Sequence, residues 1–141
     1  MLFAILDESL PDYFSRIIKT LNLTKSEQDA YYNELFADID NRVGLHHQFM
    51  GHAKPVQSDM QLDCQLVSNG ISVGAPDWHT GPRRDALEAG ASDWRLLLQV
   101  DSDENAGMDW VESGRLYYWI TRSSLKSRSF DDVWVMLQYC L

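Results

Sequence analysis

The sequence predicts an α+β fold in which two N-terminal helices pack on an antiparallel β-sheet. Apolar residues follow helical spacing in the first forty or so positions, whereas later segments are short, strand-like and separated by turn residues. The 141 residues fit one domain, and a hydrophobic content of 45% allows a packed core. We therefore expect a helical segment at 1–42 and a β-rich region at 43–141, within one domain overall.

Two helices are predicted in the N-terminal segment. Pro11 suits a first helical turn, and apolar residues follow at helical spacing: Phe14, Ile17, Ile18 and Leu21. Thr24 and Glu27 then form a capping box, in which each satisfies a backbone donor of the other. A broad apolar stripe follows the box: Tyr31, Tyr32, Leu35, Phe36 and Ile39. Two antiparallel helices are the simplest interpretation.

The β-rich region contains several predicted strands. Residues 62–66 alternate in polarity and precede Asn69-Gly70, which indicates a hairpin turn to a strand at 71–73. A short helix is expected at 84–89, and strands are expected at 94–100 and 115–120. Residues 123–129 form a polar connector, and the apolar run 133–139 indicates a central strand. The predicted core comprises Trp94, Leu96, Leu98, Leu116, Tyr118, Val133, Val135 and Leu137.

Charge and composition restrict the partners. A net charge of -9 argues against nucleic acid or an anionic membrane as the target, because both are bound mainly through Lys and Arg. The negative charge is compatible with a basic protein, a cationic ligand or a metal ion as the partner. It could also do no more than keep the protein soluble. The apolar start at 1–6 is too short for a signal peptide or a membrane span, so we expect a cytoplasmic protein. Cys64 and Cys140 lie in apolar runs, where buried, reduced thiols are expected.

An acidic loop at 101–113 is the sharpest candidate site. Oxygen-bearing side chains stand at the ligand positions of a calcium loop: Asp101, Asp103, Asn105, Asp109 and Glu112. Ala106 replaces the usual turn glycine, and the flanking segments are strand-like. The loop could equally be a partner-binding surface formed by Asp101, Asp103, Asp109, Trp110 and Glu112, or simply a solvated hairpin. Trp78, in another loop, is a further candidate contact residue.

Catalytic motifs are weak by comparison. His46, His47 and His52 could bind zinc or act as a general base, but adjacent histidines on extended backbone point apart, and HExxH is absent. The sequence also lacks the G-x-S-x-G, Walker and G-x-G-x-x-G patterns. A Ser–His–Asp triad assembled in space stays open. No catalytic residue is therefore named, and a non-enzymatic protein is favoured.

The second half of the chain resembles the C-terminal part of the YwqG-like proteins, a bacterial family of unknown function. The matching segments are GHAKPVQSDM at 51–60, LDCQLVSNG at 62–70, ALEAG at 86–90, DWRLLLQVDSDENAGMDW at 93–110, GRLYYWI at 114–120 and FD-VWV at 130–135. Family members usually have Gly-aromatic-Pro where this chain has Gly51-His52-Ala53, and they carry an additional β-rich region. The resemblance implies sheet edges that need cover from the N-terminal helices, a second copy or another protein.

Three functions are consistent with these observations. The leading hypothesis is a non-enzymatic protein-binding module, in its most specific form an immunity protein that neutralises a basic toxin, because some family members lie near toxin genes. The alternative is a calcium- or small-ligand-binding domain, with calcium as the only cofactor considered. An uncharacterised hydrolase is the third. A homo-oligomer is left open.

Overall fold

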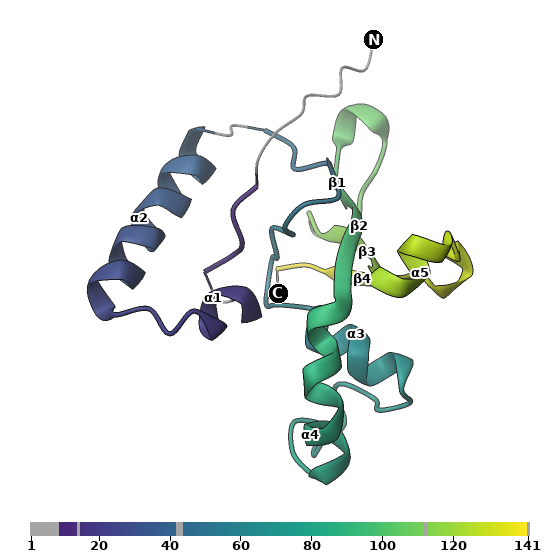
Figure 1. Cartoon of the computed structure of the whole chain (residues 1–141). Helices are drawn as coiled ribbons and strands as arrows, with labels where there is room; N and C mark the ends of the chain where they lie inside the picture. Colours follow the sequence, from purple (N-terminus) through teal and green to yellow (C-terminus); the bar gives the residue numbers. More distant parts are fainter. Residues whose placement is uncertain (1–8, 14, 42–43, 112, 141) are drawn as a thin grey trace.

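A four-stranded antiparallel sheet organises the molecule. The computed structural model of the protein describes residues 9–13, 15–41, 44–111 and 113–140. The strands are β1 (Gln48–Phe49), β2 (Trp94–Asp101), β3 (Arg115–Thr121) and β4 (Trp134–Gln138), and they lie in that order across the sheet (Figure 1). Together with the helices, the sheet confirms the α+β class and the strands predicted at 94–100 and 115–120.

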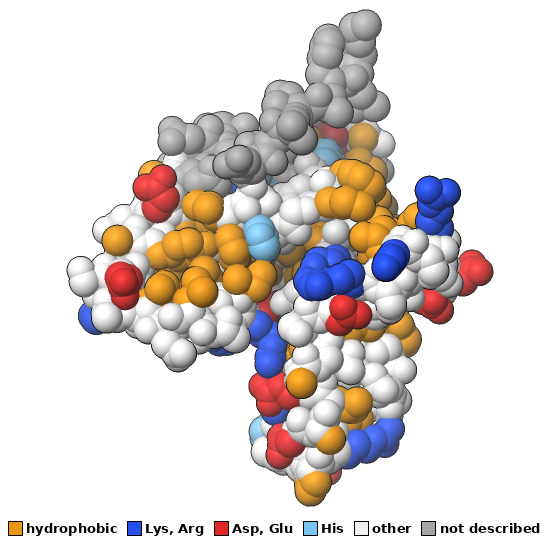
Figure 2. Space-filling view, in the orientation of Figure 1, with side chains coloured by type: hydrophobic (Ala, Val, Ile, Leu, Met, Phe, Trp, Pro, Cys, Tyr) orange, Lys and Arg blue, Asp and Glu red, His pale blue; other side chains and the backbone are white. Residues whose placement is uncertain are grey.

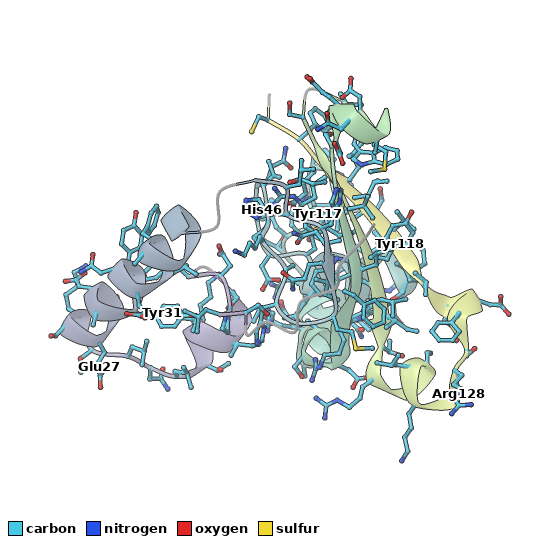
Figure 3. All side chains as sticks on the ribbon, turned by 90° about the horizontal axis from the view of Figure 1, so that it is seen from above. Glu27, Tyr31, His46, Tyr117, Tyr118 and Arg128 are labelled. Atoms are coloured by element: carbon cyan, nitrogen blue, oxygen red, sulfur yellow. The ribbon has the colours of Figure 1, made fainter. Side chains whose placement is uncertain are left out.

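The N-terminal segment contains α1 (Arg16–Thr20) and α2 (Lys25–Asn41). The capping box forms at the start of α2: the Thr24 amide donates to Glu27 Oε2 at 2.8 Å, and the Glu27 amide donates to Thr24 Oγ1 at 3.4 Å. Pro11 lies outside α1, which begins after its N-cap residue Ser15. Figures 1 and 3 show α2 beside the sheet, so the predicted packing of two helices on the sheet is not confirmed.

The predicted strand at 62–66 is wrong, because the chain forms the helix α3 (Gln61–Ser68) there. Asn69-Gly70 ends this helix instead of turning a hairpin. Gly70 has a φ of 77°, its amide donates to the Val67 carbonyl, and the Ile71 amide donates to the Leu66 carbonyl. These bonds make a Schellman motif, which needs a positive φ at the same place as a hairpin turn does.

Helical turns connect the remaining strands. The predicted short helix is confirmed as α4 (Pro82–Glu88), which continues into the 3-10 turn η1 (Ala89–Asp93). The predicted polar connector after β3 contains a helix, α5 (Arg122–Ser127), followed by η3 (Phe130–Asp132). Thr121 caps α5, since its hydroxyl accepts a hydrogen bond from the Ser124 amide at 3.1 Å.

A β-bulge in β2 decides which of its side chains face the core. The pairing with β3 shifts between Leu96 and Leu98, so the alternation of side chains reverses at that point. Trp94 and Leu96 are buried before the bulge, as predicted, whereas Gln99 and Asp101 are buried after it. Leu98, predicted as core, therefore turns to the opposite face of the sheet.

The predicted core is also wrong for β3 and β4. Tyr117 is buried, whereas Leu116 and Tyr118 turn to the other face and remain half-buried. Figure 3 shows Tyr117 on the side of the sheet where His46 lies, and Tyr118 on the other side. The core face holds one cluster of buried residues: Met60, Cys64, Trp94, Leu96, Tyr117 and Trp119.

β4 is an edge strand and not the predicted central one. Val135 and Leu137, both predicted as core residues, are 51% and 39% exposed, and Val133 is half-buried just before the strand. A continuous apolar run indicates a strand with apolar residues on both faces. Here only one face of that strand is packed, so the other presents apolar side chains to solvent.

Buried polar side chains hold the 46–58 segment, which is irregular apart from β1, on the sheet. Gln99 and Gln138 are 0% and 5% exposed. Their side-chain amides bond, at 2.7 to 3.0 Å, main-chain groups of His46, Lys54, Val56, Gln57 and Ser58. A segment without regular structure must satisfy its backbone groups in this way when it is packed against a core.

Two further predictions can be compared with the described residues. Cys64 is buried, as expected, but Cys140 is exposed, and both are free thiols. No helix in the described ranges is long and apolar enough to cross a lipid bilayer.

Candidate functional site

The first residue of the predicted acidic loop is held inside the molecule. Asp101 ends β2 and is only 8% exposed. Arg115 donates from Nε and Nη2 to the two Asp101 oxygens at 3.0 Å each, and the His46 amide donates to Oδ2 at 2.9 Å. Burial raises the pKa of Asp101, but the bonds from Arg115 and His46 outweigh it and hold the pKa below its usual range. Asp101 therefore does not face solvent, and both of its oxygens stabilise the fold. Its role in partner or metal binding stays a prediction.

Asp103 is likewise engaged within the chain. Its carboxylate accepts hydrogen bonds from the Asn105 and Ala106 amides at 2.9 and 3.4 Å, which caps the 3-10 turn η2 (Glu104–Ala106). The other oxygen lies 3.7 Å from Nε2 of His47. Glu104 and Asp109 are exposed, so they carry the accessible negative charge of the described part of the loop. Glu112, the last predicted ligand, lies outside the described residues.

Calcium binding by this loop stays a prediction. Within the described ranges, no three His, Cys, Asp or Glu side chains come together as a metal-binding group. A cation at Asp101 would also have to displace the guanidinium of Arg115, which already occupies both carboxylate oxygens. Charge repulsion between the ion and Arg115 would weaken such a site.

The two predicted contact tryptophans lie far apart. Trp110 is half-buried, and its Nε1 donates to the Asp101 carbonyl at 3.1 Å, which fixes the ring against the loop. Trp78 is half-buried in the segment between α3 and α4, with its ring in edge contact with that of His79. Figure 1 shows this segment and the 101–113 loop at opposite ends of the molecule. One surface cannot include both rings.

The histidines have separate roles. His47 Nδ1 accepts a hydrogen bond from the Asp101 amide at 3.1 Å, so this side chain supports the sheet end. His52 lies elsewhere, and burial followed by the charge of Arg95 lowers its pKa. These positions do not assemble a zinc site among the described residues.

The sheet also has an outer face, on the side opposite the core cluster. Most apolar residues of this outer face were predicted to lie in the core. Strand register places these residues in two rows across the strands. One row contains Phe49, Leu98, Tyr118 and Val135, and the other contains Val100, Leu116 and Leu137. Phe49 is 70% exposed, and Val135 and Leu137 are also exposed. Figure 2 shows hydrophobic side chains over the strands and another group of them on the α2 side of the molecule.

This outer sheet face adjoins the acidic loop. The loop leaves β2 directly after Asp101 and enters β3 at Arg115, beside the row that contains Val100 and Leu116. Glu104 and Asp109 therefore project from the same end of the sheet. An apolar area bordered by charge is typical of a protein–protein contact surface, with the charges at its rim.

Comparison with known proteins places the chain in a family without assigning it a function. No curated protein matches the sequence. A family sequence model matches residues 6–140, and this range includes the helical segment as well as the part from His47 onward. The narrower YwqG-like name and the placement in the C-terminal part of a family domain stay predictions. The match nonetheless covers nearly the whole chain, and the protein belongs to the family described as a domain of unknown function, DUF1963.

Proposed function

We propose that this protein is a non-enzymatic protein-binding module whose partner is a protein with a basic surface. The observation that carries the proposal is the outer sheet face, on which Phe49, Val135 and Leu137 are exposed beside the acidic loop. In its most specific form, the protein is a cytoplasmic bacterial immunity protein. It would then neutralise a basic toxin by covering the toxin's functional surface.

The energetics of the outer sheet face favour a protein partner. Burying a large apolar side chain stabilises a complex by roughly 1.5–3 kcal/mol compared with leaving it in water. Phe49 and Val135 lie in one row, so a single apolar ridge on the partner can contact both. Aromatic and aliphatic side chains at the centre of an interface supply most of its binding energy.

The charge of the chain selects a basic partner over an acidic one. A net charge of -9 accelerates encounter with a positively charged protein, and Glu104 and Asp109 place part of that charge at the rim. The same charge opposes association with nucleic acid. Rim charges act mainly on the association rate, whereas the apolar rows act mainly on dissociation.

Capture at the outer sheet face tests the location of the interface. We expect a photo-reactive residue at position 49 or 135 to crosslink the partner in the native host. The same residue at position 25, at the exposed start of α2, should not capture that protein. A crosslink to a second copy of this chain would replace the proposed hetero-complex by a homo-oligomer. Partner capture from position 25 alone would reject the outer sheet face as the interface.

Binding measurements with the purified partner test whether apolar contacts and rim charges contribute to binding as proposed. We expect Val135→Asp to weaken binding about tenfold or more, because the new charge would lose its hydration in the interface. The control Leu21→Asp, at another exposed apolar position, should leave affinity unchanged. Glu104→Gln combined with Asp109→Asn should slow association several-fold at low salt. The control Glu34→Gln, on exposed α2, should have little effect, and equal affinity of wild type and Val135→Asp would refute the proposal.

A further inference from the structure

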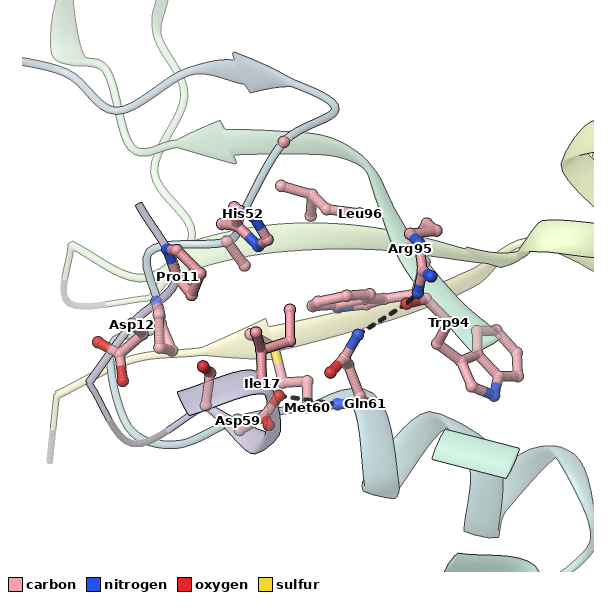
Figure 4. A pocket seen from close by; sticks show the side chains of 15 residues that line it. Pro11, Asp12, Ile17, His52, Asp59, Met60, Gln61, Trp94, Arg95 and Leu96 are labelled. Carbon is pink, nitrogen blue, oxygen red and sulfur yellow. Dashed lines mark hydrogen bonds between the residues drawn. The ribbon is translucent and has the colours of Figure 1, made fainter. Parts of the chain in front are cut away.

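A pocket on the core side of the sheet is separate from the outer sheet face. It has a volume of about 190 Å³ and lies between Pro11, Asp12, Ser15 and Ile17 on one side and residues 51–61 and strands β2 and β3 on the other (Figure 4). Pockets for drug-sized ligands measure about 300–1,000 Å³, so this smaller space suits a small organic molecule. The proposed protein interface does not use these residues.

The pocket has an apolar floor formed by the main core cluster. Met60 is fully buried, and Trp94, Leu96 and Trp119 are nearly so, and all of them line the pocket. Ile17 closes the pocket from the α1 side (Figure 4). A ligand here would need an apolar body, since ligand pockets commonly combine apolar walls with a few polar groups that orient the ligand.

One polar group of the pocket lacks a partner. Trp119 is 4% exposed, and its Nε1 is buried without a hydrogen-bond acceptor among the described residues. By contrast, Trp94 Nε1 donates to Gln65 Oε1 at 2.8 Å. A buried donor without an acceptor is costly and uncommon in native proteins. An acceptor oxygen supplied by a ligand would satisfy it.

The charges around the pocket indicate where an anionic group would lie. Arg95 donates to the carbonyls of Ser92 and Trp94 through Nη1, and among the described residues its Nε and Nη2 have no acceptor. His52 also lines the pocket, and the pKa shift that burial and Arg95 impose favours its neutral form. Positive charge is therefore concentrated at the Arg95 end of the pocket.

Two carboxylates line the pocket at some distance from that end. Asp59 accepts hydrogen bonds from the Arg16 and Gln61 backbone amides at 2.9 and 3.2 Å, so its carboxylate links the N-terminus of α1 to that of α3. Figure 4 shows Asp12 and Arg95 at opposite ends of the pocket. This separation orients a ligand, with its anionic group toward Arg95.

We propose that the pocket binds a small organic carboxylate. Protein atoms enclose Trp119 Nε1, so a small shift of the Trp119 ring would let one carboxylate oxygen accept a hydrogen bond from its N–H, while the negative charge lies beside Arg95. The apolar body of the ligand packs on Met60 and Leu96. The required features converge from separate parts of the chain, which distinguishes this pocket from a chance surface hollow.

A titration monitored by nuclear magnetic resonance tests the proposal. Benzoate and butyrate serve as probes, and benzamide is the neutral counterpart of benzoate. We expect the Trp119 indole N–H signal, assigned with Trp119→Phe, to move downfield and saturate with a Kd of about 1 mM or tighter. The indole signal of Trp110, which lies in the 101–113 loop away from the pocket, should stay in place. The pKa of His52 should rise when benzoate binds, because an anion stabilises the charged imidazole.

Matched variants measure how much the positive charge of Arg95 contributes to ligand binding. Arg95→Gln should weaken benzoate binding about tenfold and leave any benzamide binding unchanged. Arg122→Gln, which removes an exposed charge, should leave benzoate binding unchanged. Either of two results overturns the proposal: no movement of the Trp119 signal with any probe, or equal binding of benzoate and benzamide. Neither result affects the proposed function, because the outer sheet face lies on the other side of the sheet.

Discussion

Replacing Arg115 by methionine should lower the free energy of unfolding by about 3–5 kcal/mol, because it leaves the buried charge of Asp101 without its partner. Arg115 supplies two of the hydrogen bonds that hold the Asp101 carboxylate, and its Nη1 also donates to the Lys54 carbonyl at 2.6 Å. The methionine side chain keeps most of the volume but offers none of these donors. Urea denaturation of the wild type and of Arg115→Met at neutral pH measures the difference.

Two control variants test whether the loss of stability comes from the Asp101–Arg115 ion pair. Arg122→Met removes an exposed arginine 3.7 Å from Asp93, and it should change stability by about 0.5 kcal/mol or less. The double variant Asp101→Leu with Arg115→Met leaves no stranded charge, so it should be more stable than Arg115→Met alone. An Arg115→Met protein as stable as the wild type would show that water or another cation reaches Asp101.

Acid should reduce the effect of Arg115→Met. In the wild type, the pKa of Asp101 is held low, so this group stabilises the fold above its unfolded pKa and loses the contribution as pH falls through the folded value. In Arg115→Met, protonation of Asp101 removes the unpaired charge. The stability difference between the two proteins should therefore shrink as pH falls.

Asp63→Asn should stabilise the protein at pH 7.5, by roughly 1–3 kcal/mol from the size of the pKa shift. Asp63 lies in the first turn of α3, where the helix dipole favours a negative charge. Burial nevertheless raises its pKa from 3.8 to about 6, with a further contribution from the charge of Asp59. Asparagine has the same shape and never carries this charge.

The sign of the pH dependence follows from that shift. Between the unfolded and folded pKa values, the folded state binds the proton more tightly, so the wild type loses stability as pH rises through this interval. Asp63→Asn should therefore match the wild type near pH 4 and exceed it at pH 7.5. The control Asp131→Asn, at an exposed position of η3, should show no such pH-dependent gain. A destabilised Asp63→Asn at pH 7.5 would mean that the Asp63 carboxylate has a compensating partner.

Local signals predicted several elements correctly. The Thr24–Glu27 capping box marks the start of α2 because its reciprocal hydrogen bonds involve only residues within one turn. The apolar and aromatic content of β2 and β3 predicts strands because such side chains suit a pleated, half-buried surface. These features depend on near neighbours in the sequence, which explains why the prediction succeeded.

Other predictions failed where one local signal serves two structures. Asn69-Gly70 provides the positive φ for a helix end as readily as for a hairpin turn, and contacts of α3 with β2, α4 and η1 favoured the helix. The bulge at Leu97 reversed the side-chain alternation in β2, and no residue type marks it in advance. A one-residue shift of this kind moves every later side chain to the opposite face.

The candidate sites, too, depend partly on local sequence and partly on contacts between distant segments. The amino-acid sequence by itself determined the acidic charge, the position of the 101–113 loop and the supply of apolar strand residues. Only the tertiary structure decided that Arg115 neutralises Asp101, that Val135 faces solvent and that the buried Trp119 N–H has no acceptor among the described residues. The physical reason is that burial and hydrogen-bond pairing depend on which distant segments pack together, and strand order and register set that packing.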